Sequence, residues 1–246
     1  MTGNIRRFGV LVPPANIAVE DEFRRHVPAG VQYHVARLYR SSFDTNYDTM
    51  TEMVTSTEQA AKQVAQTRPE VIAWACTSGS FIEGKDHDEG IARRIQDVSG
   101  IPAITTSTAM VSALRAVNAR RVYLVTPYVQ DLNEREERFL RDSGFTVTHT
   151  ASFLHPHTLL IGATKSADVV SLVMKHRKDA GEFDTVFMSC TQLHSMDQIE
   201  HLEQELGVPV ISSNQATLWA SLRHMGIDTP VAGLGRLFHT RTTLAA

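Results

Sequence analysis

Residues 71–80 read VIAWACTSGS, and residues 185–193 read TVFMSCTQL. Each stretch begins with an apolar run typical of a buried strand and continues into a cysteine, a threonine and further polar residues. Cys76 and Cys190 are the two cysteines of the chain, and they lie 114 positions apart. Thr77 and Thr191 keep the same separation. The two stretches therefore predict that the chain contains two related α/β units.

Further matches extend this register away from the cysteines. Pro13 follows the apolar run FGVLV, and Pro127 follows VYLVT, again 114 positions later. Gly-Ile-Pro at 100–102 recurs as Gly-Val-Pro at 207–209, where the separation has fallen to 107 because of a deletion in the second copy. The alternative is that any two β-α-β units look alike. We favour a duplication because proline, cysteine and threonine all stay in register.

Short apolar or β-branched runs alternate with stretches of helical period along the whole chain, which indicates mainly parallel sheets with helices on both faces. We therefore predict an α/β fold of two similar Rossmann-like lobes, related by a pseudo-twofold axis. The first lobe comprises residues 1–112 plus 214–246, and the second comprises residues 113–213. The predicted strands are residues 8–12, 31–38, 71–75, 101–105, 122–125, 146–150, 185–189 and 208–212, and the predicted helices include 50–66, 132–141, 167–176 and 196–206.

The composition argues against several classes of function. The chain has 246 residues, of which 42% are hydrophobic and 21% charged, and its net charge of −3 provides no basic field for nucleic acid. We find no apolar stretch long enough to span a membrane, no glycine-rich nucleotide loop, and no zinc-binding spacing among the eleven histidines. We therefore expect a cytoplasmic protein, commonly a homodimer at this size, with no cofactor, no metal, and neither nucleic acid nor membrane as partner.

Both cysteines are predicted at the carboxyl ends of strands, where open α/β sheets bind their ligands. Thr77 and Ser78 begin a turn whose hydroxyl and backbone N–H groups suit a carboxylate, and the same donors would lower the thiol pKa. A lone cysteine at such a place is often a small apolar filler. Filler need not recur at matching positions, so we predict that Cys76 and Cys190 face each other across a small carboxylate substrate.

Two loops at corresponding strand ends should border the same cleft. The loop VPPAN carries Asn16, and the loop TPYVQ carries Tyr128. An amide and a phenol can hydrogen-bond a carboxylate or polarise a carbonyl. Asn16 could instead only cap the following helix, and Tyr128 could be a half-buried surface aromatic.

The motifs VPPAN, CTSGS, TPYVQDLNE and SCTQL, in this order, resemble those of the aspartate/glutamate racemase superfamily, and most closely its maleate cis-trans isomerase and arylmalonate decarboxylase branches. The resemblance spans residues 8–222. Decarboxylases of that branch have glycine at the position of Cys76, so the presence of both cysteines favours the isomerases. The resemblance implies that a Cys76 thiolate adds to the double bond of maleate or an analogue and that Cys190 acts as acid and base. It implies a substrate-binding set of Asn16, Pro14, Thr77, Ser78, Tyr128, Thr191 and Gln192.

This chain departs from the isomerase pattern in two places. The isomerases use a second asparagine from the second half, whereas this chain has no asparagine between Asn133 and Asn214, and residues 161–164 read Ile-Gly-Ala-Thr in that region. Thr191 and Gln192 follow Cys190 where the decarboxylases have glycines. The alternatives are a two-cysteine racemase of an amino or hydroxy acid, an arylmalonate-type decarboxylase that needs Cys190 alone, or a carboxylate-binding protein without catalysis.

Overall fold

The computed structural model describes residues 5–84 and 86–240 and contains two four-stranded sheets in which every strand pair is parallel. The strand orders are β2-β1-β3-β4 and β6-β5-β7-β8, so the second sheet repeats the first. The predicted α/β fold of two similar lobes is therefore confirmed. The strands are β1 Arg6–Val12, β2 Val31–Arg37, β3 Ile72–Trp74, β4 Ala103–Thr105, β5 Arg121–Thr126, β6 Thr146–Ser152, β7 Thr185–Met188 and β8 Val210–Ser212.

The helices depart from the prediction mainly at residues 50–66, where one continuous helix was expected. The structure has two helices there, separated at Ser56, whose hydroxyl accepts from the Tyr39 N–H at 2.9 Å and donates to the Met53 carbonyl. A tertiary contact with the loop after β2 therefore marks the break. Residues 196–206 likewise divide into a 3-10 turn, η1, and a helix. The helices are α1 Ala18–His26, α2 Tyr47–Thr55, α3 Thr57–Ala65, α4 Thr77–Phe81, α5 His87–Ser99, α6 Thr106–Ala116, α7 Gln130–Asp142, α8 Thr158–Ala163, α9 Ser166–His176, η1 Met196–Gln198, α10 Ile199–Leu206, α11 Ser213–His224 and η2 Arg236–His239.

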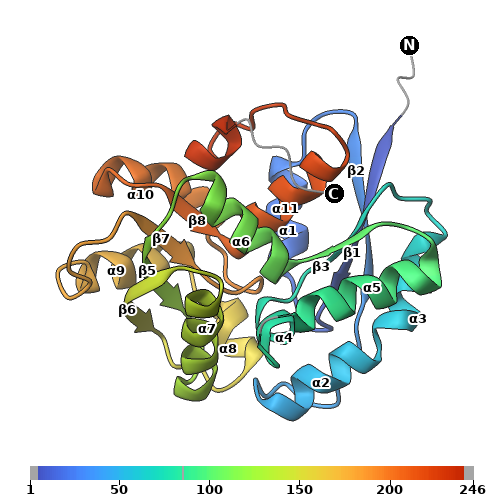
Figure 1. Ribbon diagram of the computed structural model, residues 1–246, viewed down its shortest axis with the longest axis horizontal. Coiled ribbons are helices and arrows are strands. Elements are labelled where there is room, and N and C mark those ends of the chain that lie inside the picture. Colours follow the sequence, from blue (N-terminus) through green and yellow to red (C-terminus); the bar gives the residue numbers. More distant parts are fainter. Residues whose placement is uncertain (1–4, 85, 241–246) are drawn as a thin grey trace.

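Helices α6 and α11, which follow the last strand of each sheet, pack against each other and join the two lobes. They lie between the two sheets in Figure 1. Helix α6 also contacts β8 of the second sheet, and α11 contacts β3 and β4 of the first. Nearly all of α11 is buried, including Trp219 and Leu218. The division into residues 1–112 plus 214–246 and residues 113–213 stays a prediction.

The joined arrangement brings the carboxyl ends of the two sheets toward one region. The core is continuous from Phe8 and Trp74 in the first lobe to Tyr123 and Phe187 in the second. In the part of the chain that the structure describes, no helix is long and apolar enough to cross a membrane.

Candidate active site

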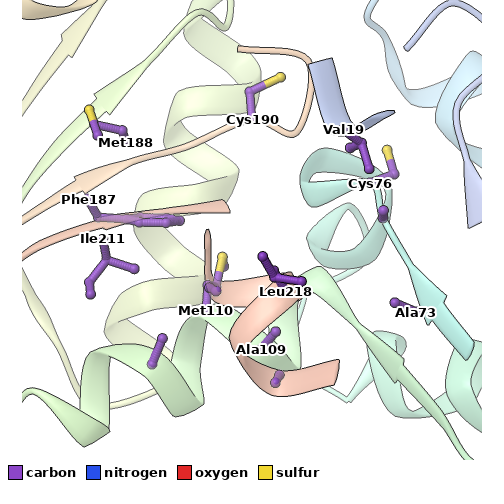
Figure 2. Packing of buried hydrophobic residues seen from close by; sticks show 14 of the residues in the cluster. Val19, Ala73, Cys76, Ala109, Met110, Phe187, Met188, Cys190, Ile211 and Leu218 are labelled. Carbon is purple, nitrogen blue, oxygen red and sulfur yellow. The ribbon is translucent and has the colours of Figure 1, made fainter. Parts of the chain in front are cut away.

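Cys76 and Cys190 lie directly beyond the carboxyl ends of β3 and β7, one from each lobe, and line the same cavity. Figure 2 shows them on separate segments, with Cys190 beyond the strand that carries Phe187 and Met188. Both are free thiols, 4% and 8% exposed. The enclosed space is about 20 Å³, room for one water molecule, so a substrate requires the lining side chains to move. The two cysteines thus meet as the register of the sequence predicted.

The backbone at Cys190 is held in a conformation that residues with a side chain rarely adopt. Its φ angle is +97°, and its N–H donates to the Ser213 hydroxyl at 3.0 Å. The same hydroxyl accepts from Thr77 of the other lobe at 2.9 Å. Strain of this kind costs about 1–3 kcal/mol and gathers at functional sites. Ser213, which sequence reasoning missed, therefore links the two cysteine turns.

Burial raises the pKa of the Cys76 thiol, and the Gly79 N–H, the Ser78 hydroxyl and the Arg40 guanidinium offset this only in part. The Ser78 oxygen lies 3.9 Å from the sulfur. The expectation that the turn lowers the thiol pKa is therefore wrong in its net direction. Loss of hydration outweighs the donors, because the charged form is the one that burial penalises.

Burial also raises the pKa of Cys190, to about 12, although the Tyr128 hydroxyl and the Gln192 N–H lower it. The neighbouring Cys76 and Glu136 add to the increase. The Arg40 guanidinium interacts with both thiols, and its positive charge lowers the pKa of Cys76. Cys190 therefore keeps its proton near neutral pH, and Cys76 has a nearby cation that favours its thiolate.

Gly79 gives the Cys76 turn its close packing. A Cβ atom there would lie 2.5 Å from the Trp74 ring and 3.2 Å from the Cys76 sulfur. Trp74 is fully buried and donates its indole N–H to Thr57 at 2.9 Å, so it has little freedom to retreat. The glycine therefore allows the helix α4 backbone to approach the sulfur.

Asn16 lies in the cavity lining, 1% exposed, and connects the lobes. Its Oδ1 accepts from the Val19 N–H at 3.1 Å, as in the capping alternative, while its Nδ2 donates to Thr191 at 3.3 Å. The Thr191 hydroxyl in turn donates to the Ala75 carbonyl. Both residues line the cavity as predicted, but their polar groups already hold the two lobes together.

Gln192 also holds the two lobes together, through hydrogen bonds to the loop after β1. Its Oε1 accepts from the Ile17 N–H and its Nε2 donates to the Ala15 carbonyl, both at 2.9 Å. The side chain thus positions the loop that carries Asn16. Within that loop Pro13 lines the cavity, and Pro14 is not among the lining residues; its carbonyl accepts from Arg37 instead. The structure places the preceding proline, rather than Pro14, against the site.

Tyr128 is 1% exposed, so the alternative of a half-buried surface aromatic is wrong. Its ring meets Phe81 edge-on, and its carbonyl accepts from the Asn133 and Ser152 side chains. Its hydroxyl lines the cavity without a hydrogen-bond partner among the described residues. Tyr128 is thereby fixed at its backbone, and its hydroxyl lies near enough to Cys190 to lower the pKa of that thiol.

Several lining residues escaped sequence reasoning. Most distinctive is Arg40, a buried cation in the loop after β2, two residues beyond the end of the predicted strand 31–38. The rule that parallel sheets bind ligands at carboxyl ends could have indicated this loop. No sequence pattern indicates that the apolar side chains of Met50 and Met53 on α2 and of Ile161 on α8 line the cavity. The missed lining residues are Arg40, Thr45, Met50, Met53, Thr158 and Ile161.

One group of side chains with metal-binding chemistry lies elsewhere. His149, His176 and Asp179 bring their ligand atoms within 4.8 Å of one another. None of them lines the cysteine cavity.

Comparison with known proteins yields matches along almost the whole chain. Residues 8–238 match the family model of arylmalonate decarboxylase. The maleate isomerase of Nocardia farcinica is 29% identical over 252 residues, which cover 98% of this chain and 99% of that protein. The arylmalonate decarboxylase of Bordetella bronchiseptica is 31% identical over 232 residues, covering 94% and 95%.

A solved structure of the Nocardia farcinica maleate cis-trans isomerase is also similar. It is a cysteine-to-serine mutant with a covalently bound succinylcysteine intermediate. The TM-score is 0.87 at 26% identity, over 95% of this chain and 98% of that one.

Proposed function

Because this chain belongs to the arylmalonate decarboxylase family, we propose that it acts as a maleate isomerase-like enzyme, converting a cis-butenedioate, maleate or an analogue, into the trans isomer. The observation that carries the proposal is the pair of buried free thiols at equivalent positions of two sheets, lining one cavity. A relative of matching fold, named a maleate cis-trans isomerase, has been solved with a succinylcysteine intermediate. No cofactor enters the chemistry.

The reaction follows from one nucleophile and one acid. The Cys76 thiol first releases its proton to solvent. The resulting thiolate forms an S–C bond to one alkene carbon, and the π electrons move toward the other carbon and its carboxylate. The Cys190 thiol gives its proton to that carbon, leaving a thioether with a single bond that rotates. The Cys190 thiolate then takes the proton back, the double bond re-forms in the trans geometry, and the Cys76 thiolate leaves.

The environments of the thiols support this division of roles. The pKa of Cys190 is raised to about 12, so this thiol enters the reaction carrying the proton that the adduct needs. Cys76 has the Gly79 N–H and the Arg40 charge to stabilise its thiolate. Thr77, Ser78 and Asn16 would bind one carboxylate, and the free Tyr128 hydroxyl would face charge developing near Cys190.

The test is conversion of maleate to fumarate by the purified protein without added metal or nucleotide, followed by proton NMR. Cys76→Ala should abolish turnover. Cys190→Ser should accumulate an adduct heavier by one maleic acid, on the peptide that contains Cys76. Absence of both fumarate and adduct in the presence of folded protein would contradict the proposal.

Decarboxylation is the second candidate because the 31% identical relative is an arylmalonate decarboxylase. That chemistry requires Cys190 alone. Release of carbon dioxide from an arylmalonate by Cys76→Ala at the wild-type rate would support it in place of isomerisation.

We also propose a cytoplasmic homodimer. Two unpaired thiols suit a reducing compartment. Exposed apolar side chains gather on the segments that flank the cavity, Tyr39, Phe43 and Tyr47 from one lobe and Leu154, Leu159 and Leu160 from the other. Light scattering coupled to gel filtration should give twice the chain mass; a single-chain mass would refute the dimer.

A further inference from the structure

Arg40 is the one charged side chain among the described residues that line the cysteine cavity. It is only 8% exposed. Its Nε and Nη2 atoms are buried without a hydrogen-bond partner, and no ion pair involves it in the described part of the chain. A buried guanidinium with unused donors is uncommon, because such charges are normally paired.

The backbone on both sides of Arg40 is tied to helix α2 and its end. The Tyr39 N–H donates to Ser56 at 2.9 Å, and Ser41 donates its N–H and hydroxyl to Glu52 at 2.6 and 2.8 Å. The side chain is therefore held at the cavity by its neighbours rather than by contacts of its own. This arrangement fixes the guanidinium and leaves its donors available.

Among residues 5–84 and 86–240, no acidic group pairs with Arg40 at short range. Asp44 and Glu52 act on Arg40 from a distance, yet Glu52 is engaged by Ser41 and Asp44 by Ser42. The two thiols also face it, but burial raises the pKa of both, so they are neutral near pH 7. A buried charge without a partner destabilises the folded protein. An anion from outside the chain would offset that destabilisation.

Several other polar side chains of the cavity have hydrogen bonds within the protein. Thr77 donates to Ser213, Thr191 to Ala75, and Gln192 binds Ala15 and Ile17. Within residues 5–84 and 86–240, the lining residues with buried polar atoms that lack any partner are Arg40 and Tyr128. These two residues therefore have polar atoms available to a ligand, in addition to the carboxylate site proposed for Thr77, Ser78 and Asn16.

We propose that Arg40 binds the second carboxylate of the substrate and thereby selects cis-dicarboxylates over acids with a single carboxylate. The inference rests on the proposed isomerase function and deepens it. Arg40 follows β2 and the Cys76-Thr77 turn follows β3, with β1 between them. The loops after β2 and β3 are separated by two inter-strand distances, roughly 10 Å. An arginine side chain and a four-carbon diacid together span that distance. The planar guanidinium fork matches a carboxylate.

Arg40→Met removes the positive charge, and Arg40→Lys keeps the charge but removes the planar guanidinium that can bind a carboxylate through two N–H groups. Each is assayed with maleate and with maleamate, in which an amide replaces one carboxylate. For Arg40→Met we expect kcat/KM to fall about 100-fold or more with maleate and less than about 10-fold with maleamate, because only the dianion uses the lost charge. Arg40→Lys should lose about 10-fold with maleate. Arg24→Met, at an exposed position on α1, is the matched control and should change neither substrate.

A second readout does not need turnover. Iodoacetamide labelling of Cys76 is followed by peptide mass spectrometry with increasing succinate, and each protein is normalised to its own unprotected rate. Wild type should be protected, and Arg40→Met should need about 100-fold more succinate. Because the Nε and Nη2 atoms of Arg40 have no partner among the described residues, the variant should unfold at a Tm no lower than wild type.

The outcomes separate the two proposals. Equal losses with maleate and maleamate, or equal protection of wild type and Arg40→Met by succinate, would overturn the role of Arg40. If wild type fails to isomerise maleate, the isomerase proposal fails, and succinate protection alone then decides whether Arg40 recognises a dicarboxylate.

Discussion

Glu136 offers a quantitative test of how burial controls titration beside the active site. It lies on α7 with no exposed surface; its Oε1 accepts from the Ser189 hydroxyl at 2.6 Å, and its Oε2 has no partner among the described residues. Burial raises its pKa from 4.5 to about 8, with the Ser189 hydrogen bond opposing. Glu136→Gln keeps an acceptor for Ser189 and removes the titration.

The magnitude follows from the difference between the two pKa values. Between 4.5 and about 8 the unfolded carboxyl is ionised and the native one is protonated, so the native state binds one more proton. The free energy of unfolding of wild type therefore falls as pH rises, by up to about 1.4 kcal/mol per pH unit. From about pH 5 to about pH 7.5 the loss amounts to about 3 kcal/mol. The stabilisation is complete below 4.5 and lost through about 8.

Urea unfolding at a series of pH values measures this loss directly. The Glu136→Gln curve should be shallower than wild type by the amount above, whatever constant offset the amide introduces. Glu22, whose pKa burial raises to about 7, contributes equally to both proteins and cancels in the difference. Glu134→Gln, at an exposed position of the same helix, should run parallel to wild type. Parallel curves for wild type and Glu136→Gln would refute the reasoning.

Three further predictions concern the site. Gly79→Ala should lower the free energy of unfolding by about 1–3 kcal/mol and remove most of the activity, because its Cβ would lie 2.5 Å from the Trp74 ring. The control Gly90→Ala, on α5, has no atom within 4 Å of its Cβ and should raise the free energy of unfolding by about 1 kcal/mol, both measured by urea denaturation. Gly162→Ala would place its Cβ 2.5 Å from Gln192 Nε2, so the bond to Ala15 should break and KM should rise without an equal loss of kcat; an unchanged KM would count against the positioning role of Gln192. Alkylation of Cys76 and of Cys190 in the wild-type protein, followed by peptide mass spectrometry, should accelerate from neutral to alkaline pH, because burial raises the pKa of each thiol; a pH-independent rate would contradict the effect of burial.

Much of the fold could be predicted from the sequence because it depends on local pattern. Buried parallel strands are short apolar runs, and the described strands begin or end within about two residues of the predicted ones. The helix break at Ser56 could not be predicted, since it depends on a hydrogen bond from Tyr39 in another segment. The contacts of α6 with the second sheet and of α11 with the first could not be predicted either, because they join segments far apart in the sequence.

Part of the candidate site could be predicted from local sequence pattern, and part depends on tertiary contacts. The duplication register and the strand-end rule brought Cys76, Cys190, Asn16 and Tyr128 to one place, because equivalent strand ends of two joined parallel sheets meet. The orientation of Arg40 could not be read from the sequence, since neighbouring hydrogen bonds to Glu52 and Ser56 aim its side chain. The side chains of Thr191 and Gln192 form hydrogen bonds between the lobes, and residue spacing in the sequence does not predict these bonds.

By itself, the sequence determined that two cysteines would stand at equivalent strand ends, because the positions of strands follow from short-range hydrophobic pattern. Only the tertiary structure decided their chemical state. The pKa of each thiol depends on how completely the folded chain removes it from water and on which charge from another loop lies beside it. Burial reversed the expected direction of the pKa shift, because solvation and charge are properties of the assembled cavity rather than of neighbouring residues in the chain.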